Sequence, residues 1–129
     1  MKLINKIASL IKIVVKIKIY ISHPKENKIL VYDRMSKKFA DVLFVKKNFS
    51  FYDVRFDSIN LYVFFFTLVN SGLKGFKINY KFNYFNFVKP DIIYTSIDNN
   101  VGFFRLKKLY PNALYIADQN GMRDNRFFS

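Results

Sequence analysis

Apolar positions in the first segment, from Met1 to about Ile17, recur with the period of a helix. One face collects the apolar side chains of Leu3, Ile4, Ile7, Leu10, Ile11, Val14 and Val15. The opposite face carries Lys2, Asn5, Lys6, Ser9, Lys12 and Lys16. This pattern predicts a basic amphipathic helix. Its apolar runs fall short of the roughly 18–20 residues that a membrane span needs. The helix therefore either packs on its own domain or lies on an anionic bilayer.

Further along, short apolar runs end in polar residues, as buried strands of a parallel sheet do. Four segments predict such strands: Lys28–Arg34, Ser50–Val54, Asp91–Ile97 and Ala113–Ala117. The polar segment from Ser22 to Asn27 contains Pro24 and separates the first strand from the helix before it.

Helical patterns alternate with these strands. A short helix is expected around Asp41–Val45, and a longer one over Ile59–Asn70 with Ser58 as its N-cap and Gly72 beyond its end. The latter is apolar nearly all round, which predicts burial on more than one side. Tyr80–Val88 fits a strand or a helix, and we favour a helix that ends before Pro90. Asp98 is expected to cap a helix over Asn100–Tyr110.

This alternation predicts an α/β domain with an open, mostly parallel, Rossmann-like sheet of about four strands, flanked by helices on both faces. We expect two parts: residues 1–27, the basic helix and its connector, and residues 28–129, the Rossmann-like domain. The chain stops soon after the last predicted strand without a closing helix, so this domain is expected to be incomplete.

Charge adds one constraint. Lys and Arg number 22 against 9 Asp and Glu, a formal charge of +13. The excess suits an anionic partner, but it also fits a general bias toward Lys, Asn, Ile, Phe and Tyr. The chain has no cysteine, which excludes disulfides and thiolate sites and fits a cytoplasmic protein.

Candidate chemistry gathers at the predicted strand ends, where open α/β sheets bind ligands. Three polar clusters fall there: Asp33-Arg34, Asp98-Asn99-Asn100 and Gln119-Asn120-Gly121. Each is also explained by ordinary turn and capping chemistry. The sequence contains no glycine-rich dinucleotide loop, no P-loop and no catalytic triad pattern. The single histidine, His23, has no candidate co-ligands, so we expect a surface residue and no metal site.

Several segments appear together in a familiar order: Lys28–Arg34, Ser58–Tyr62, Val88–Ile93, Ile97–Asn100, Phe104–Pro111 and Ile116–Gly121. In this order they resemble the N-terminal part of bacterial surface-carbohydrate (capsule or lipopolysaccharide) biosynthesis proteins with a GT-B-like glycosyltransferase architecture. The order and spacing carry the resemblance, over about residues 28–128. Asp118 departs from it, since a small or apolar residue is expected there.

The resemblance implies a two-domain enzyme with its active site between the domains. The N-terminal half would bind a carbohydrate or lipid-linked acceptor, lined by Asp33, Arg34, Asp98, Asn99, Gln119 and Asn120, with Arg34 at a phosphate. A nucleotide-sugar donor would bind a second domain that this chain lacks. The chain is therefore expected to be a fragment that does not catalyse transfer alone, and no catalytic residue is assigned. Residues 2–17 could hold the protein peripherally at the inner membrane.

Two alternatives remain open. Basic residues interleaved with aromatics suit a nucleic-acid-binding module, although the aromatic runs, such as Phe64–Phe66, are typical of a core. A membrane-surface or scaffold protein without enzymatic activity would use the basic N-terminal helix. Salt-sensitive nucleic-acid binding would favour the first alternative. Vesicle binding that is lost with residues 1–18 would favour the second, or a membrane-peripheral enzyme.

Overall fold

The computed structural model describes residues 2–54, 58–97 and 100–118, which form two compact units. The helical unit contains Met1–Lys25 and Asp53–Phe87, and the sheet unit contains Glu26–Tyr52 and Val88–Ser129. Each unit is therefore built from two chain segments. The second segment of the helical unit is inserted between two strands of the sheet unit, an arrangement that hydrophobic patterning along the chain did not indicate.

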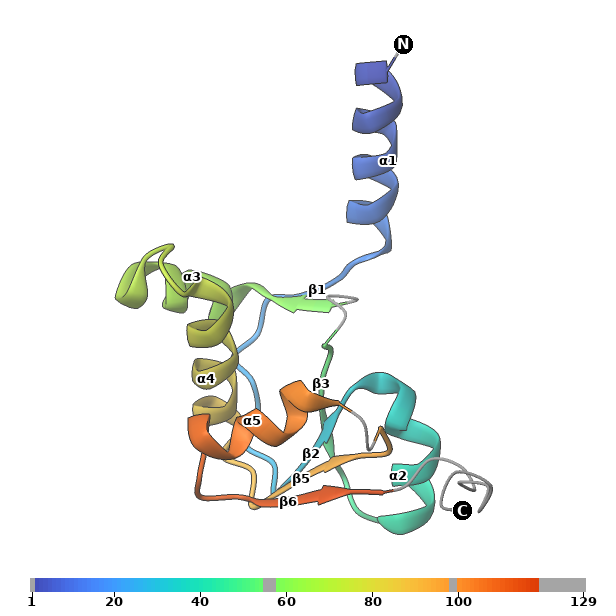
Figure 1. The fold of residues 1–129 in the computed structure, drawn as a ribbon, viewed down its shortest axis with the longest axis vertical. Coiled ribbons are helices and arrows are strands. Elements are labelled where there is room, and N and C mark those ends of the chain that lie inside the picture. The colour runs from blue at the N-terminus through green and yellow to red at the C-terminus, as the bar shows by residue number, and fades with distance from the viewer. Residues whose placement is uncertain (1, 55–57, 98–99, 119–129) are drawn as a thin grey trace, which may run out of the picture. The chain divides into compact units, whose positions relative to one another are not determined.

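The sheet unit contains four parallel strands in the order β3-β2-β5-β6 (Figure 1). They span Ile29–Tyr32 (β2), Ser50–Tyr52 (β3), Ile92–Thr95 (β5) and Leu114–Ala117 (β6). All four residues of β2 are buried, as expected for a central strand covered on both faces. The predicted α/β class, with an open parallel sheet of about four strands, is confirmed.

Helical connections leave the two central strands in opposite directions. The 3₁₀ turn η1 (Arg34–Ser36) and helix α2 (Lys37–Leu43) lead from β2 to β3 on one side. Helix α5 (Val101–Leu109) leads from β5 to β6 on the other. Because such crossovers are right-handed, opposite directions place the helices on opposite faces of the sheet.

Side-chain packing agrees with this two-faced arrangement. On one face, Val31 and Tyr94 of the central strands form a buried cluster with Ala40 of α2. On the other face, Tyr32 stacks on Tyr52 with ring centroids 5.7 Å apart and contacts Phe103 of α5 at the same distance. Adjacent residues of β2 thus anchor opposite layers, as the pleat of a strand requires.

The helical unit consists of the N-terminal helix, a short two-stranded parallel sheet and a helical hairpin. Its elements are α1 (Lys2–Lys16), β1 (Lys18–Tyr20), β4 (Ser58–Asn60), α3 (Leu61–Ser71) and α4 (Phe76–Val88), whose last residue belongs to the sheet unit. The strands pair with Ile19 opposite Ile59. The N-terminal helix and the helix before Pro90 are confirmed, the latter starting four residues earlier than predicted.

The expected N-caps were wrong at both capped helices. Ser58 lies within β4, and Asn60 caps α3 by accepting a hydrogen bond from the Val63 amide at 3.1 Å. Asn60 also donates to the Ser22 carbonyl, so a tertiary contact favours the later start. Asn100 caps α5 by accepting from the Phe103 amide at 3.3 Å. Asp98, the cap expected there, lies outside the described residues.

The expectation that the apolar helix is buried on more than one side was also wrong. Only Val63 and Thr67 of α3 are buried, whereas Phe65 is 56% and Val69 83% exposed. The helix has the composition of a core helix but packs on the rest of its unit through one narrow stripe of side chains. Its other apolar side chains are half-buried, as at Leu61, Phe64 and Leu68, or exposed.

The central strand gives a stability prediction. Leu30 is fully buried, so Leu30→Ala is expected to lower the free energy of unfolding by about 2–5 kcal/mol through lost burial and a cavity. Leu114→Ala in β6 is the matched control, because Leu114 is 59% exposed and its loss is expected to cost less than about 0.5 kcal/mol. Urea unfolding followed by circular dichroism measures both. Equal losses in the two variants would contradict the central position of β2.

Candidate ligand site at the carboxyl edge of the sheet

The two central strands of the sheet unit create a topological switch point. β2 and β5 are hydrogen-bonded neighbours, with Val31 opposite Tyr94, and their connections run to opposite sides of the sheet. The loops that follow these strands therefore diverge at the carboxyl edge. Open α/β sheets bind their ligands in the crevice formed at such a point.

Three buried hydroxyl side chains tie these two loops together. Ser36, at the end of η1, accepts a hydrogen bond from the Ser96 amide at 2.9 Å, and its Oγ lies 3.0 Å from the Ser96 Oγ. The Thr95 hydroxyl lies 3.4 Å from the same Ser36 oxygen. All three residues are buried, so polar side chains connect the two loops beneath the carboxyl edge of the sheet. These residues were not among the predicted site residues, although Thr95-Ser96 directly follows an apolar strand run.

Asp33 lies at this edge, directly after β2, but its side chain turns inward. The residue is 5% exposed, and its carboxylate accepts a hydrogen bond from the Met35 amide at 3.1 Å, capping η1. Its backbone φ of 83° lies in a region that L-residues rarely adopt. Such strain persists only where the surroundings enforce it and gathers at functional sites. The geometry gives Asp33 a loop-shaping role in the crevice wall.

Arg34 follows Asp33 and is half-buried. Its guanidinium carbon lies 5.4 Å from the centre of the Phe51 ring on β3, within the range of a cation–π contact. The contact restricts the side chain, so the planar fork of donors is partly oriented before any ligand arrives. Arg34 is thus a held cation beside the switch point.

Tyr32, the last residue of β2, brings a buried hydroxyl toward the first turn of α5. A Cβ atom added at Gly102 would lie 4.0 Å from that hydroxyl and 3.0 Å from the Asn100 side-chain oxygen. Glycine at this position therefore keeps the capped helix start close to the strand end. Burial, with a smaller contribution from the Asp33 carboxylate, raises the pKa of Tyr32 to about 12. The hydroxyl is neutral at ordinary pH and acts as a hydrogen-bonding group.

Of the six predicted site residues, the structure describes Asp33 and Arg34 and places both at the expected edge. Asp98, Asn99, Gln119 and Asn120 lie outside the described residues. The last residue of β6, Ala117, pairs with Thr95 of β5, and the Asp118 amide donates to the Thr95 carbonyl at 2.9 Å.

Within the described ranges, no three His, Asp or Glu side chains lie close enough to hold a metal ion. His23 is exposed, as expected. Its ring packs edge-on against Tyr62 and Phe87, both at 4.8 Å, and its Nδ1 lies 2.7 Å from the Pro24 carbonyl oxygen. In the same described ranges, no helix combines the length and apolar character needed to cross a membrane.

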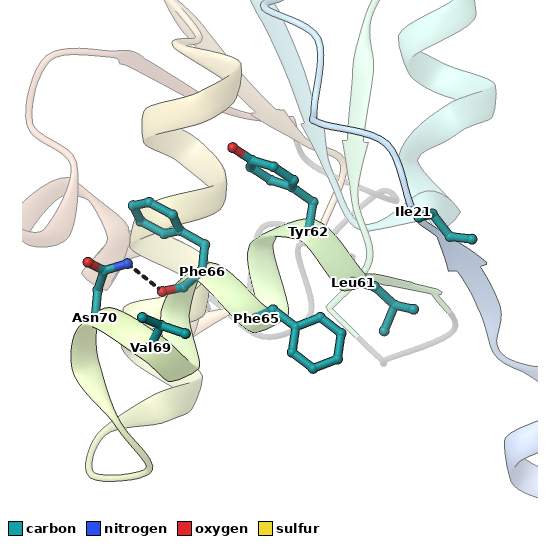
Figure 2. Close-up of a pocket in the computed structure, with 7 residues that line it drawn as sticks. All are labelled: Ile21, Leu61, Tyr62, Phe65, Phe66, Val69 and Asn70. Carbon is teal, nitrogen blue, oxygen red and sulfur yellow. Dashed lines mark hydrogen bonds between the residues drawn. The ribbon is translucent and has the colours of Figure 1, made fainter.

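The helical unit carries an apolar groove, shown in Figure 2. It is open, measures ≈ 510 Å³, and is lined by Ile21, Leu61, Tyr62, Phe65, Phe66, Val69 and Asn70. The Asn70 amide donates to the Phe66 carbonyl within α3, so that side chain is occupied by its own helix. With an almost entirely apolar lining, the groove suits hydrocarbon rather than a sugar or a phosphate.

Comparisons of this chain with protein-family models, with curated proteins and with solved structures find no match. The resemblance to surface-carbohydrate glycosyltransferases therefore stays a prediction from the sequence.

The hydroxyl cluster yields a prediction for Ser36. Ser36→Ala removes the acceptor of the buried Ser96 amide, and an unsatisfied buried donor costs about 1–3 kcal/mol of folding free energy. Ser71→Ala, at the exposed end of α3, serves as the control and should change stability by less than about 0.5 kcal/mol. Urea unfolding measures both. A neutral Ser36→Ala would show that the two loops do not depend on this contact.

A second prediction concerns alkaline pH. Because the pKa of Tyr32 is raised from 10.0 to about 12 in the folded chain, the unfolded chain loses this proton first as pH rises. The contribution of Tyr32 to the free energy of unfolding is fully present below pH 10 and is lost as pH rises toward 12. Tyr32→Phe is expected to lessen this loss, measured as the pH dependence of the urea midpoint. If the urea midpoint falls equally steeply with pH in Tyr32→Phe and in the unaltered chain, Tyr32 does not contribute to the loss of stability.

Proposed function

We propose that the sheet unit binds the acceptor of a bacterial surface-polysaccharide glycosyltransferase, and that this acceptor is a phosphorylated or lipid-phosphate-linked sugar. The observation that carries the proposal is the position of Arg34, which follows β2 at the carboxyl edge of the sheet and is held against Phe51 of the neighbouring strand β3. A ligand at a switch point meets side chains from both central loops.

The chemistry of this edge suits such an acceptor. A guanidinium offers paired N–H donors that match the oxygens of a phosphate. The capped start of α5 adds the partial positive charge of a helix N-terminus close by. The Asn100 side chain, at the start of α5, carries an amide NH₂ group of the kind that donates to sugar hydroxyls, whereas the buried hydroxyls of Ser36 and Ser96 hold the two loops in place. A guanidinium together with a side-chain amide favours a ligand that carries both a phosphate and hydroxyls.

The transfer reaction itself requires more than this unit. In the proposed assignment, the nucleotide-sugar donor binds a second α/β domain, and the sheet unit orients the acceptor toward it. The described residues supply binding and orientation, and no catalytic base is assigned among them.

Glucose 1-phosphate is a soluble probe for this site. Titrated into the isotope-labelled full chain, it is expected to shift the amide NMR signals of Arg34, Ser36 and Ser96. Arg34→Ala is expected to weaken binding about 10- to 100-fold, the range for losing a charge-assisted hydrogen-bonding pair. Arg105→Ala removes the same charge from an exposed position on α5 and is the matched control.

Three outcomes would contradict the proposal. The probe could leave the signals of the β2 and β5 loops unchanged. Both arginine variants could lose affinity equally, which would indicate general charge attraction. A single-stranded oligonucleotide could bind the same loops more tightly than the sugar phosphate, which would favour the nucleic-acid alternative.

A further inference from the structure

Helix α1 presents apolar side chains to solvent along the part of its apolar face whose side chains the structure describes. Among its described side chains, Leu3 is 71%, Ile4 69%, Leu10 60% and Ile11 57% exposed. These residues share one face at helical spacing. An apolar stripe of this length is costly to leave in water, since each large side chain gains roughly 1.5–3 kcal/mol on full burial.

The rest of the helical unit also buries few of its large apolar side chains. Within the described residues, its only buried large apolar side chains are Val63 and Phe85. Around the groove of Figure 2, by contrast, Ile21 is 77% and Val69 83% exposed. Exposed apolar patches of this kind mark interaction surfaces.

The charge pattern identifies the partner. Six lysines precede the first acidic residue, Glu26: Lys2, Lys6, Lys12, Lys16, Lys18 and Lys25. The four of these lysines that lie on α1 occupy the face opposite its apolar stripe. A second copy of the chain packed on the apolar face would leave the lysines without an anionic partner, and a nucleic acid would neutralise the lysines but leave the apolar face in water. An anionic bilayer satisfies both faces, since headgroups meet the lysines while the apolar side chains enter the acyl boundary.

We propose that the helical unit docks on the surface of an anionic phospholipid bilayer. Helix α1 lies in the plane of the interface, and Ile21 and Val69 at the groove add a second apolar contact to the same bilayer. This inference does not rest on the proposed acceptor site, because none of its residues belongs to the sheet unit.

Vesicle co-sedimentation of the full chain tests the proposal. The chain is expected to bind vesicles of equimolar phosphatidylcholine and phosphatidylglycerol at least tenfold more tightly than vesicles of phosphatidylcholine alone. Binding should weaken as salt rises from about 0.1 M to about 0.5 M, because salt screens the lysines. Equal binding to both vesicle types, or no binding to either, would overturn it.

Two sets of variants locate the contact. Replacing Lys2, Lys6, Lys12 and Lys16 with glutamine is expected to lower the partition coefficient by about 600-fold, since each lysine near such a surface contributes roughly fivefold. The control carries the same change in charge at exposed lysines of the sheet unit: Lys38, Lys46, Lys47 and Lys108 replaced with glutamine. Equal losses in the two sets would mean that net charge alone drives binding, against the proposal.

The apolar contacts are tested separately. The triple change Ile4→Gln, Ile7→Gln and Ile11→Gln retains all lysines and good helix formers, and is expected to reduce vesicle binding at least tenfold. Val69→Asp, at an 83% exposed position, is expected to reduce it several-fold with folding preserved. Unchanged binding in the triple variant would overturn the role of α1, and unchanged binding in Val69→Asp would remove the groove from the contact.

Discussion

The pairing of β2 with β5 is the constraint on which the sheet unit depends. All of Ile29–Tyr32 is buried, and this strand hydrogen-bonds to β3 on one side and β5 on the other. Its alternate residues anchor both layers, because Val31 faces the α2 side while Tyr32 faces α5. The same pairing makes the connections diverge, so core packing and the separation of the two loops have one cause. A shift in this register would reverse the faces and separate Ser36 from Ser96.

The predictable parts of the fold are those with strong local patterns. The apolar run before Asp33 and the one ending at Thr95 could be identified as buried strands because a fully buried strand needs continuous hydrophobicity. The pair β1 and β4 left no such signal, since each strand has three residues and Asn60 is the one buried residue among them. The start of α3 depends on a tertiary contact. Asn60 caps this helix and also donates a hydrogen bond to the Ser22 carbonyl, 38 positions away. Rules based on neighbouring residues do not include such a contact.

For the candidate site, the sequence indicated the edge but not its construction. Asp33 and Arg34 were recognisable as polar residues that end an apolar run. The inward turn of Asp33 depends on its positive φ, and the position of Arg34 depends on Phe51 from another strand. The Ser36–Ser96 contact joins residues 60 positions apart. Such contacts follow from strand order, which composition and periodicity along the chain do not determine.

The two units differ in how much of their apolar side chains they bury, and this difference bears on function. The sheet unit encloses large side chains such as Tyr94 and Phe103 between its layers, so its surface is free to be polar at the ligand edge. The helical unit has comparable apolar content but little interior, because α3 buries one stripe and α1 exposes its apolar face. An amphipathic surface rich in lysine gains stability by meeting a bilayer, whereas the sheet unit is stabilised within itself. A lipid-linked acceptor would unite the two properties, since its phosphate and sugar suit one unit and the membrane that carries it suits the other.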